Sequence, residues 1–145
     1  MGPNIPPSLL LATLVLITTV SYLFDRLRRS RRRAVLRGLA RQWKMHFATT
    51  DPFNLAPRVA SMFPVPGAAN LCICDVIYAQ QGDRHRYIFT AEYTQGVLRH
   101  HLRVRRAATF CEAKDQAGDC SPVQLAGGAI SVPAQYEALH KELVM

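Results

Sequence analysis

The sequence predicts an α+β membrane protein in which one N-terminal transmembrane helix continues into a basic amphipathic helix, followed by a small three-stranded antiparallel meander with short helices. Three observations lead to this prediction. Residues 5–24 carry no charge, arginines crowd directly after them, and alternating β-type segments continue to about residue 112. The expected divisions are a tail and anchor at 1–25, an arginine-rich juxtamembrane helix at 26–48, the meander domain at 49–112, and an extended tail with a short C-terminal helix at 113–145.

The apolar run is long enough to cross a bilayer, because about 20 helical residues span roughly 30 Å. A cleaved signal peptide is the competing interpretation, and it requires basic residues before the run and a small-residue cleavage site after it. Residues 1–4 contain no Lys or Arg, and arginines follow the run instead. The sequence therefore favours an uncleaved anchor.

The predicted anchor contains no ionisable side chain and no histidine. Pumps and proton relays usually need an ionisable group at membrane depth, so the helix is expected to perform no chemistry and to bind no cofactor. Its hydroxyl side chains either pack against other helices or bond to their own backbone, and we favour the second arrangement.

The formal net charge of +8 lies entirely before His46, since nine Lys and Arg are balanced by nine Asp and Glu from His46 onward. By the positive-inside rule the N-terminus is expected outside and the bulk of the chain in the cytoplasm. A role in topology and anionic-headgroup binding is favoured over a grip on nucleic acid or an acidic protein. The residues predicted to contact the membrane surface or a partner are Arg26, Arg28, Arg29, Arg31, Arg32, Arg33, Arg37, Arg41 and Trp43. We call the eight arginines the arginine collar.

An apolar stripe runs along the same predicted helix, because apolar residues recur at spacings of three and four. Its members are Leu36, Leu39, Ala40, Trp43 and Phe47.

A short helix is expected near residues 58–62, after a turn in which Asp51 is a candidate N-cap and Pro52 the first helical residue. Pro57 is expected to interrupt any helix that begins earlier. The Pro-rich stretch 64–67 should then end the helix.

The meander is predicted from three strands at about 71–79, 85–93 and 98–110, with turns at Gly82-Asp83 and Gln95-Gly96. The first turn pairs Tyr78 with Tyr87, Val76 with Phe89, Cys74 with Ala91 and Cys72 with Tyr93. The second pairs Tyr93 with Leu98, Phe89 with Leu102, Tyr87 with Val104 and Ala91 with His100.

Both turns place these residues on one face, which is apolar apart from His100. The opposite face is expected to be polar, with Glu92 opposite Arg99 as an attractive pair. The residues singled out on this face are Arg86, Glu92, Arg99, His101, Arg103 and Arg105.

Three strands with one apolar face are barely stable alone, so something must cover that face. The candidates are the 58–62 helix, the Trp43 stripe or a partner protein, and the outer strands would be open edges. In the tail, Ser131-Val132-Pro133 predicts a helix start with Tyr136, Leu139 and Leu143 on one side. That helix is either a docking element or a frayed end.

No pattern typical of a metal site is present. Cys72 and Cys74 are expected in the apolar core, and a cytoplasmic location argues against a Cys111–Cys120 disulfide. His100 and His101 point to opposite faces of a strand, so they cannot share one ion. The sequence therefore predicts no metal and no other cofactor.

No catalytic motif is present either. Asp75 and Glu92 could in principle act as an acid–base pair, but the neighbouring arginines favour structural ion pairing. The sequence therefore predicts that the chain is not an enzyme. Nucleic-acid binding on the arginine-bearing strand is disfavoured, because the aromatic residues of the sheet lie on the opposite face.

The middle half of the chain resembles uncharacterised bacterial membrane-anchored proteins with a small β-meander domain. The segments that carry the resemblance are Asp51-Pro52-Phe53, Pro64-Val65-Pro66-Gly67-Ala68, the run from Arg86 to Gly96, and Arg103-x-Arg105-Arg106. The resemblance implies the same architecture and transfers no catalytic residue.

Two functions follow as expectations. The first is a non-catalytic, single-pass accessory subunit that stabilises a larger membrane protein complex, for example a photosynthetic or respiratory one. The second is a membrane-tethered module that uses its arginines to bind anionic lipid, an acidic protein or nucleic acid. Salt separates them, because only the second should release its partner steeply as salt rises.

Overall fold

The structure is a computed structural model that describes residues 6–96, 102–113, 121–128 and 130–144. The chain divides into two compact units, Met1–Ala34 and Val35–Met145. The division falls inside the first helix. Helices and antiparallel strands together confirm the predicted α+β class.

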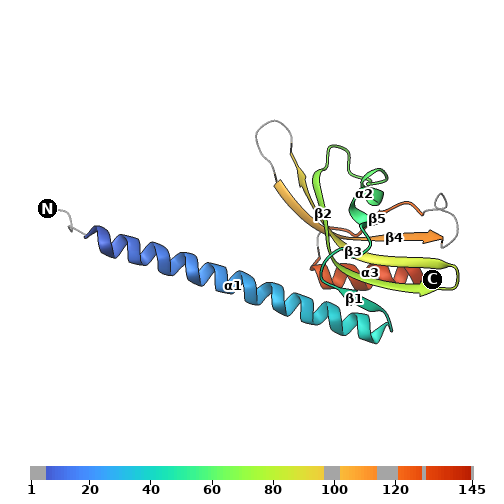
Figure 1. Cartoon of the computed structure of the whole chain (residues 1–145), viewed down its shortest axis with the longest axis horizontal. Coiled ribbons are helices and arrows are strands. Elements are labelled where there is room, and N and C mark those ends of the chain that lie inside the picture. Colours follow the sequence, from blue (N-terminus) through green and yellow to red (C-terminus); the bar gives the residue numbers. More distant parts are fainter. Residues whose placement is uncertain (1–5, 97–101, 114–120, 129, 145) are drawn as a thin grey trace. The chain divides into compact units, whose positions relative to one another are not determined.

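Helix α1 runs from Pro7 to Gln42, which confirms that the apolar and arginine-rich segments form one helix (Figure 1). Its apolar part is long enough to cross a membrane, and its side chains are exposed. The hydroxyls of Thr18 and Thr19 donate to the carbonyl oxygens of Leu14 at 2.5 Å and Val15 at 2.7 Å. These hydroxyls bond to their own helix, as the sequence favoured.

The second unit contains one antiparallel sheet of five strands in the order β1-β2-β3-β4-β5. Its central three strands are the predicted meander, whereas the two short outer strands were missed. The bounds are β1 His46–Ala48, β2 Ala69–Gln81, β3 Arg84–Gln95, β4 Leu102–Ala113 and β5 Gln124–Leu125. Phe47, assigned to the helix from its spacing, lies in β1 and still packs beside the stripe.

The β2–β3 hairpin begins in the predicted register, with Tyr78 opposite Tyr87. Asp75 has a φ of 53°, and a bulge between Cys74 and Ile77 then shifts the pairing by one residue. Cys74 therefore faces Thr90, and Cys72 faces Glu92. The predicted core location of both thiols is wrong, because Cys72 is exposed and Cys74 is only partly buried. The pairing predicted for Val76 with Phe89 is lost at the same bulge, and Val76 pairs with Ala48 of β1.

The predicted β3–β4 register is also wrong, since Tyr93 pairs with Val104 rather than Leu98. Phe89 pairs with Ala108 and Tyr87 with Phe110, in place of Leu102 and Val104. The physical reason is a longer connection than a two-residue turn, because β4 begins only at Leu102. A shift of six positions (104 minus 98) is even, so each side chain keeps its predicted face.

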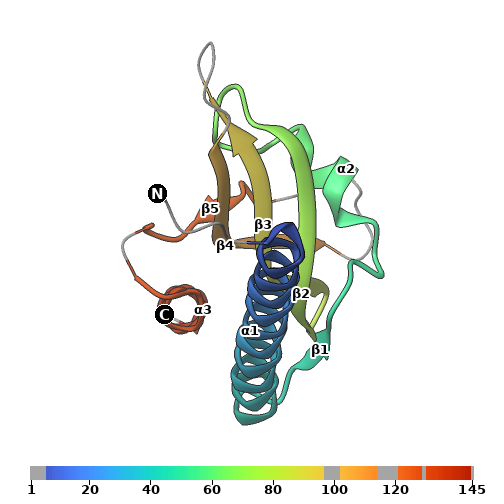
Figure 2. The ribbon, with the colours of Figure 1, turned by 90° about the vertical axis from the view of Figure 1, so that its left-hand side faces the viewer.

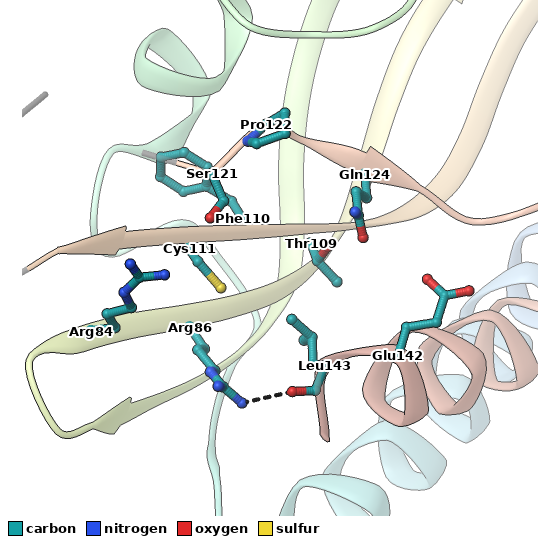
Figure 3. Close-up of a pocket in the computed structure, with 10 residues that line it drawn as sticks. All are labelled: Arg84, Arg86, Thr109, Phe110, Cys111, Ser121, Pro122, Gln124, Glu142 and Leu143. Atoms are coloured by element: carbon teal, nitrogen blue, oxygen red, sulfur yellow. Dashed lines mark hydrogen bonds between the residues drawn. The ribbon is translucent and has the colours of Figure 1, made fainter. Parts of the chain in front are cut away.

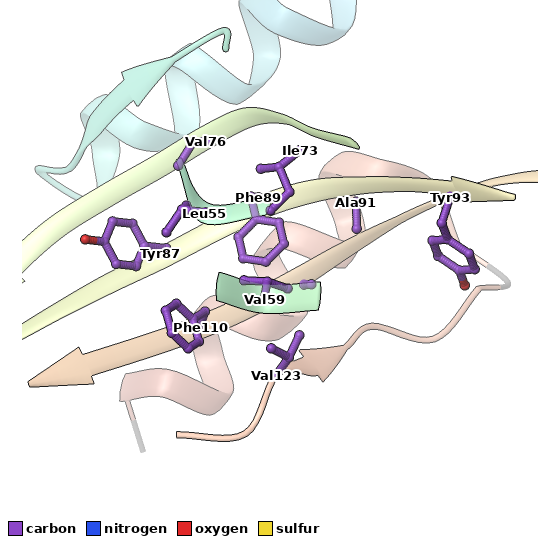
Figure 4. Close-up of a cluster of buried hydrophobic side chains, with 11 residues drawn as sticks. Leu55, Val59, Ile73, Val76, Tyr87, Phe89, Ala91, Tyr93, Phe110 and Val123 are labelled. Atoms are coloured by element: carbon purple, nitrogen blue, oxygen red, sulfur yellow. The ribbon is translucent and has the colours of Figure 1, made fainter. Parts of the chain in front are cut away.

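One face of the sheet packs under helix α2, Leu55–Ala60 (Figure 4). Leu55 and Val59 are fully buried against Phe89 and its neighbours. The helix predicted at 58–62 thus begins earlier. Pro57 sits in its first turn, where the missing N–H costs little, and does not interrupt it. Asn54 precedes the helix, so the predicted N-cap at Asp51 and helix start at Pro52 are wrong. The Asp51 carboxylate nevertheless accepts the backbone N–H groups of Phe53 and Ala56.

The opposite face was predicted to be polar, yet its centre is apolar and covered. Ile77, Ile88 and Ala107 pack against Leu36 and Ala40 of α1 and against helix α3. Helix α3 spans Val132–Val144 and lies on the other side of the sheet from α2 (Figure 2). Its Tyr136 and Leu139 are buried against the sheet of the same domain, so the C-terminal helix is not a frayed end. The Trp43 stripe and α3 together cover this face.

Candidate binding surfaces

The first part of the arginine collar forms a basic surface on α1. Asp25, the one acidic residue before His46, pairs with Arg29 at 2.8 Å, and both side chains are more than half exposed. Arg26, Arg28 and Arg31 are exposed, whereas Arg32 and Arg33 are partly buried. An exposed ion pair of this kind contributes little to stability. The basic surface is therefore available for binding and contributes little to folding.

The later residues of the same predicted set belong to the second unit. Arg41 is exposed, and the Arg37 guanidinium lies 5.7 Å from the centroid of the Phe47 ring, a cation–π contact. Trp43 stacks on His140 with ring centroids 4.0 Å apart. Burial, reinforced by nearby Arg86, lowers the pKa of His140. Trp43 therefore joins α1 to α3 within the domain.

Glu92 is the centre of a charged cluster on the sheet. Its carboxylate accepts hydrogen bonds from Arg103 at 2.8 Å and Arg105 at 2.6 Å, and only 8% of the residue is exposed. Burial acts to raise the pKa of Glu92, but the attraction of Arg105 and then Arg103 outweighs it and holds that pKa below its usual value. The thiol of Cys74 lies 3.7 Å from the same carboxylate.

The structure therefore gives Glu92 two arginine partners, although the sequence pointed to Arg99. Arg99, His100 and His101 lie outside the described residues. Asp75, the other carboxylate considered for acid–base chemistry, is fully buried on the bulge of β2. Both carboxylates are buried, so Asp75 and Glu92 do not form an accessible acid–base pair.

Arg86 lies apart from this cluster, at a hollow between β3, β4 and the end of α3 (Figure 3). Its guanidinium donates to the Leu143 carbonyl oxygen at 3.0 Å, which satisfies a carbonyl near the end of the helix. The hollow measures about 310 Å³ and also contains Arg84, Glu142 and Cys111. Burial raises the pKa of the Cys111 thiol despite Arg86 and Arg84, so the thiolate is disfavoured.

Sequence reasoning missed a triad on the other face, in which Tyr87 is buried, Glu112 is partly buried and Arg58 is exposed. The Tyr87 hydroxyl donates to Glu112 at 2.9 Å, and Arg58 of α2 pairs with the same carboxylate at 3.0 Å. Burial, followed by the hydrogen bond to Glu112 and its charge, raises the pKa of Tyr87 to about 12. The triad links α2 to the start of β3 and the end of β4.

The Tyr87 phenol should therefore titrate near pH 12 rather than near 10. Because the folded pKa is the higher one, the stability that the neutral phenol contributes is complete below pH 10 and is lost as pH rises towards 12. Phenolate absorbance of the wild-type chain minus that of Tyr87→Phe measures the pKa. Glu112→Gln should move the Tyr87 midpoint down, and a wild-type midpoint near 10 would contradict the burial of this group.

Among the residues that the structure describes, no group of three or more His, Cys, Asp and Glu side chains could hold a metal ion. Comparisons of the chain with protein-family models, curated proteins and solved structures give no match.

Proposed function

We propose that this protein is a non-catalytic, single-pass accessory subunit that stabilises a larger membrane protein complex. In this proposal the residues before α1 lie outside, and the arginine collar and the domain lie on the cytoplasmic side. The partners are other subunits of the complex, with anionic headgroups beside the collar.

The observation that carries the proposal is the double role of α1. Its first turns form the candidate membrane span, while Leu36 and Ala40 near its end are buried in the domain core. Only residues 25–35 separate Phe24 from Leu36, and even a fully extended chain of that length spans no more than about 40 Å. A domain tethered this closely can meet only partners that are at the membrane surface.

The side-chain geometry supports a non-catalytic role. Two arginines hold Glu92, and Asp75 is buried on a bulge, so both carboxylates have structural surroundings. The thiol of Cys111 is kept protonated by burial. These groups are arranged for folding, and not for proton transfer to a substrate.

The sequence argued for a partner because the apolar face of the sheet needed a cover, and this reason no longer applies. The sheet needs no partner to cover its faces, because α2 covers one face and α1 with α3 the other. Contacts with other subunits must therefore come from the candidate span, the exposed collar or the strand edges.

Gentle detergent extraction of native membranes, size separation and identification of co-migrating proteins tests the proposal. We expect a large assembly that persists as salt rises, because apolar helix packing is insensitive to screening. A matched variant, in which the uncharged residues 8–24 are replaced by an unrelated Leu-Ala span, should remain in the membrane but leave the assembly. Migration of the wild-type chain alone at low salt would overturn the proposal.

The collar favours a second candidate, a tethered module that binds anionic lipid. Eight arginines oppose Asp25 alone, and each basic group near an anionic surface contributes about 1 kcal/mol. The full chain in nanodiscs should then unfold at a higher temperature with phosphatidylserine than with phosphatidylcholine. Replacing Arg26, Arg28 and Arg31 with Gln should reduce the difference; an unchanged difference would exclude these arginines as its source.

A further inference from the structure

The outer edge of β4 is paired from Ala107 to Cys111 and open before Ala107. At Ala107 the carbonyl oxygen accepts the Ala126 N–H at 2.9 Å, and the N–H donates to Gln135 Oε1 at 2.9 Å. Alternate residues of an antiparallel strand direct their backbone groups to the same neighbour. Arg105 and Arg103 therefore also direct their N–H and C=O groups outward, away from β3.

Those outward groups have no hydrogen-bond partner among the described residues. Among the described residues, β5 pairs with Ala108 and Thr109, and Ala126, directly after β5, donates its N–H to the Ala107 carbonyl oxygen. The chain then turns beside Arg106, where a Cβ on Gly128 would lie 2.6 Å from the Arg106 guanidinium. We call Leu102–Arg106 the open edge.

Side chains give the open edge two different faces. Arg103 and Arg105 lie on the face of Glu92, and the Arg103 side chain is 74% exposed. Leu102, on the opposite face, is 68% exposed, and Val104 is partly buried beside it. Two guanidinium groups share one carboxylate, so the first face keeps a net positive charge.

We propose that the open edge binds an extended segment of another protein that alternates acidic and apolar residues and pairs with β4 as an added strand. Side chains opposite each other in a ladder share a face, so the acidic residues would meet Arg103 and Arg105 and the apolar ones Leu102 and Val104. The inference rests on the proposed function, since it names the kind of contact that another subunit would make.

Charge also decides between the alternative occupants. Antiparallel pairing of two copies of this edge would bring arginines together, which is destabilising. A nucleic acid offers no ladder of peptide N–H and C=O groups, and the sheet aromatics Tyr87, Phe89 and Tyr93 are buried. An acidic protein segment supplies hydrogen-bond partners for the outward N–H and C=O groups and negative charge for the arginine side chains.

The test uses the full chain in detergent and a synthetic peptide of alternating Glu and Val, with a Lys and Val peptide as its control. Amide hydrogen exchange at residue resolution should slow at Arg103 and Arg105 with the acidic peptide. The Val104 amide faces β3 and should not change. Fluorescence anisotropy should give binding about tenfold tighter for the acidic peptide than for the Lys peptide.

Variants separate the backbone contact from the charge. Arg103→Pro removes an outward N–H that β3 does not use, so it should abolish binding without unfolding the domain. Arg103→Gln keeps that N–H and should weaken binding less, and Arg84→Gln, distant in the sheet, should leave it unchanged. Equal loss in Arg103→Gln and Arg103→Pro would show that charge alone binds the peptide and would overturn strand addition.

The proposal is also overturned if neither amide slows, or if a single-stranded oligonucleotide slows both amides and the acidic peptide does not. Its failure is distinguishable from that of the proposed function. A wild-type chain that extracts alone, but whose Arg103 and Arg105 amides slow with the peptide, would refute the complex and retain the edge. A complex that forms although the peptide slows neither amide would retain the proposed function and refute strand addition at the open edge.

Discussion

Truncation of Leu36 to alanine should lower the free energy of unfolding of the domain by about 2–5 kcal/mol, as expected for a fully buried leucine. Leu36 is 0% exposed and packs with Ile77 and Ile88 of the sheet. The loss would come from a helix that begins as the candidate membrane span. Urea titration of the full chain in mild detergent measures it through the fluorescence of Trp43, the one tryptophan.

The neighbouring Val35 supplies the control, because its side chain is 50% exposed. Val35→Ala should change the free energy of unfolding by less than about 0.5 kcal/mol. Equal effects at the two positions would mean that the end of α1 does not contribute to the domain core. The urea dependence should stay the same in both variants, since neither changes the surface exposed on unfolding.

Helical periodicity made the end of α1 predictable. Leu36, Ala40 and Trp43 recur at helical spacing, and the structure places them together against the sheet and α3. What they cover could not be predicted, since spacing defines a face and not its partner. The face opposite Tyr87 and Phe89 was predicted to be polar because most of its residues are polar or charged, yet Ile77 and Ile88 on the same face form a buried apolar centre.

The strand register shows which pairings local sequence signals can predict and which they cannot. Gly82 adopts a φ of 59° in the first hairpin, and the pairing next to this turn was predicted correctly. The bulge at Asp75 has no comparable signal, because the strand carries no glycine there. The second turn was misplaced because Gln95-Gly96 begins a longer connection, and only the even shift preserved the faces.

The charged cluster was predictable in kind but not in detail. An arginine opposite Glu92 followed from the alternation of β4, yet its identity depends on the register, so Arg105 takes the place expected for Arg99. The Tyr87–Glu112–Arg58 triad could not be predicted, because it needs α2 placed over the sheet. Pairs that depend on one local turn are accessible from sequence, whereas those that join separate elements are not.

Truncation of Tyr136 to alanine should lower the free energy of unfolding by about 3–5 kcal/mol, the cost typical of removing a buried aromatic side chain. Tyr136 is 0% exposed, and its hydroxyl lies 2.6 Å from the Asp75 carbonyl oxygen and 2.8 Å from the Thr90 hydroxyl. The side chain therefore holds α3 against the bulge of β2. The same urea titration measures the loss.

Tyr136→Phe separates the hydroxyl from the ring. It leaves the packing intact but removes the donor to the buried Asp75 carbonyl, which should cost about 1–3 kcal/mol. Glu137→Ala, at the exposed next position of α3, should stay within about 0.5 kcal/mol of the wild type. If Tyr136→Ala were as mild as Glu137→Ala, α3 would be dispensable, and the covered face of the sheet would again require a partner. A graded loss from Phe to Ala would instead establish that the chain completes its own core, which leaves the strand edges, the arginine collar and the candidate span as the surfaces through which it meets other proteins.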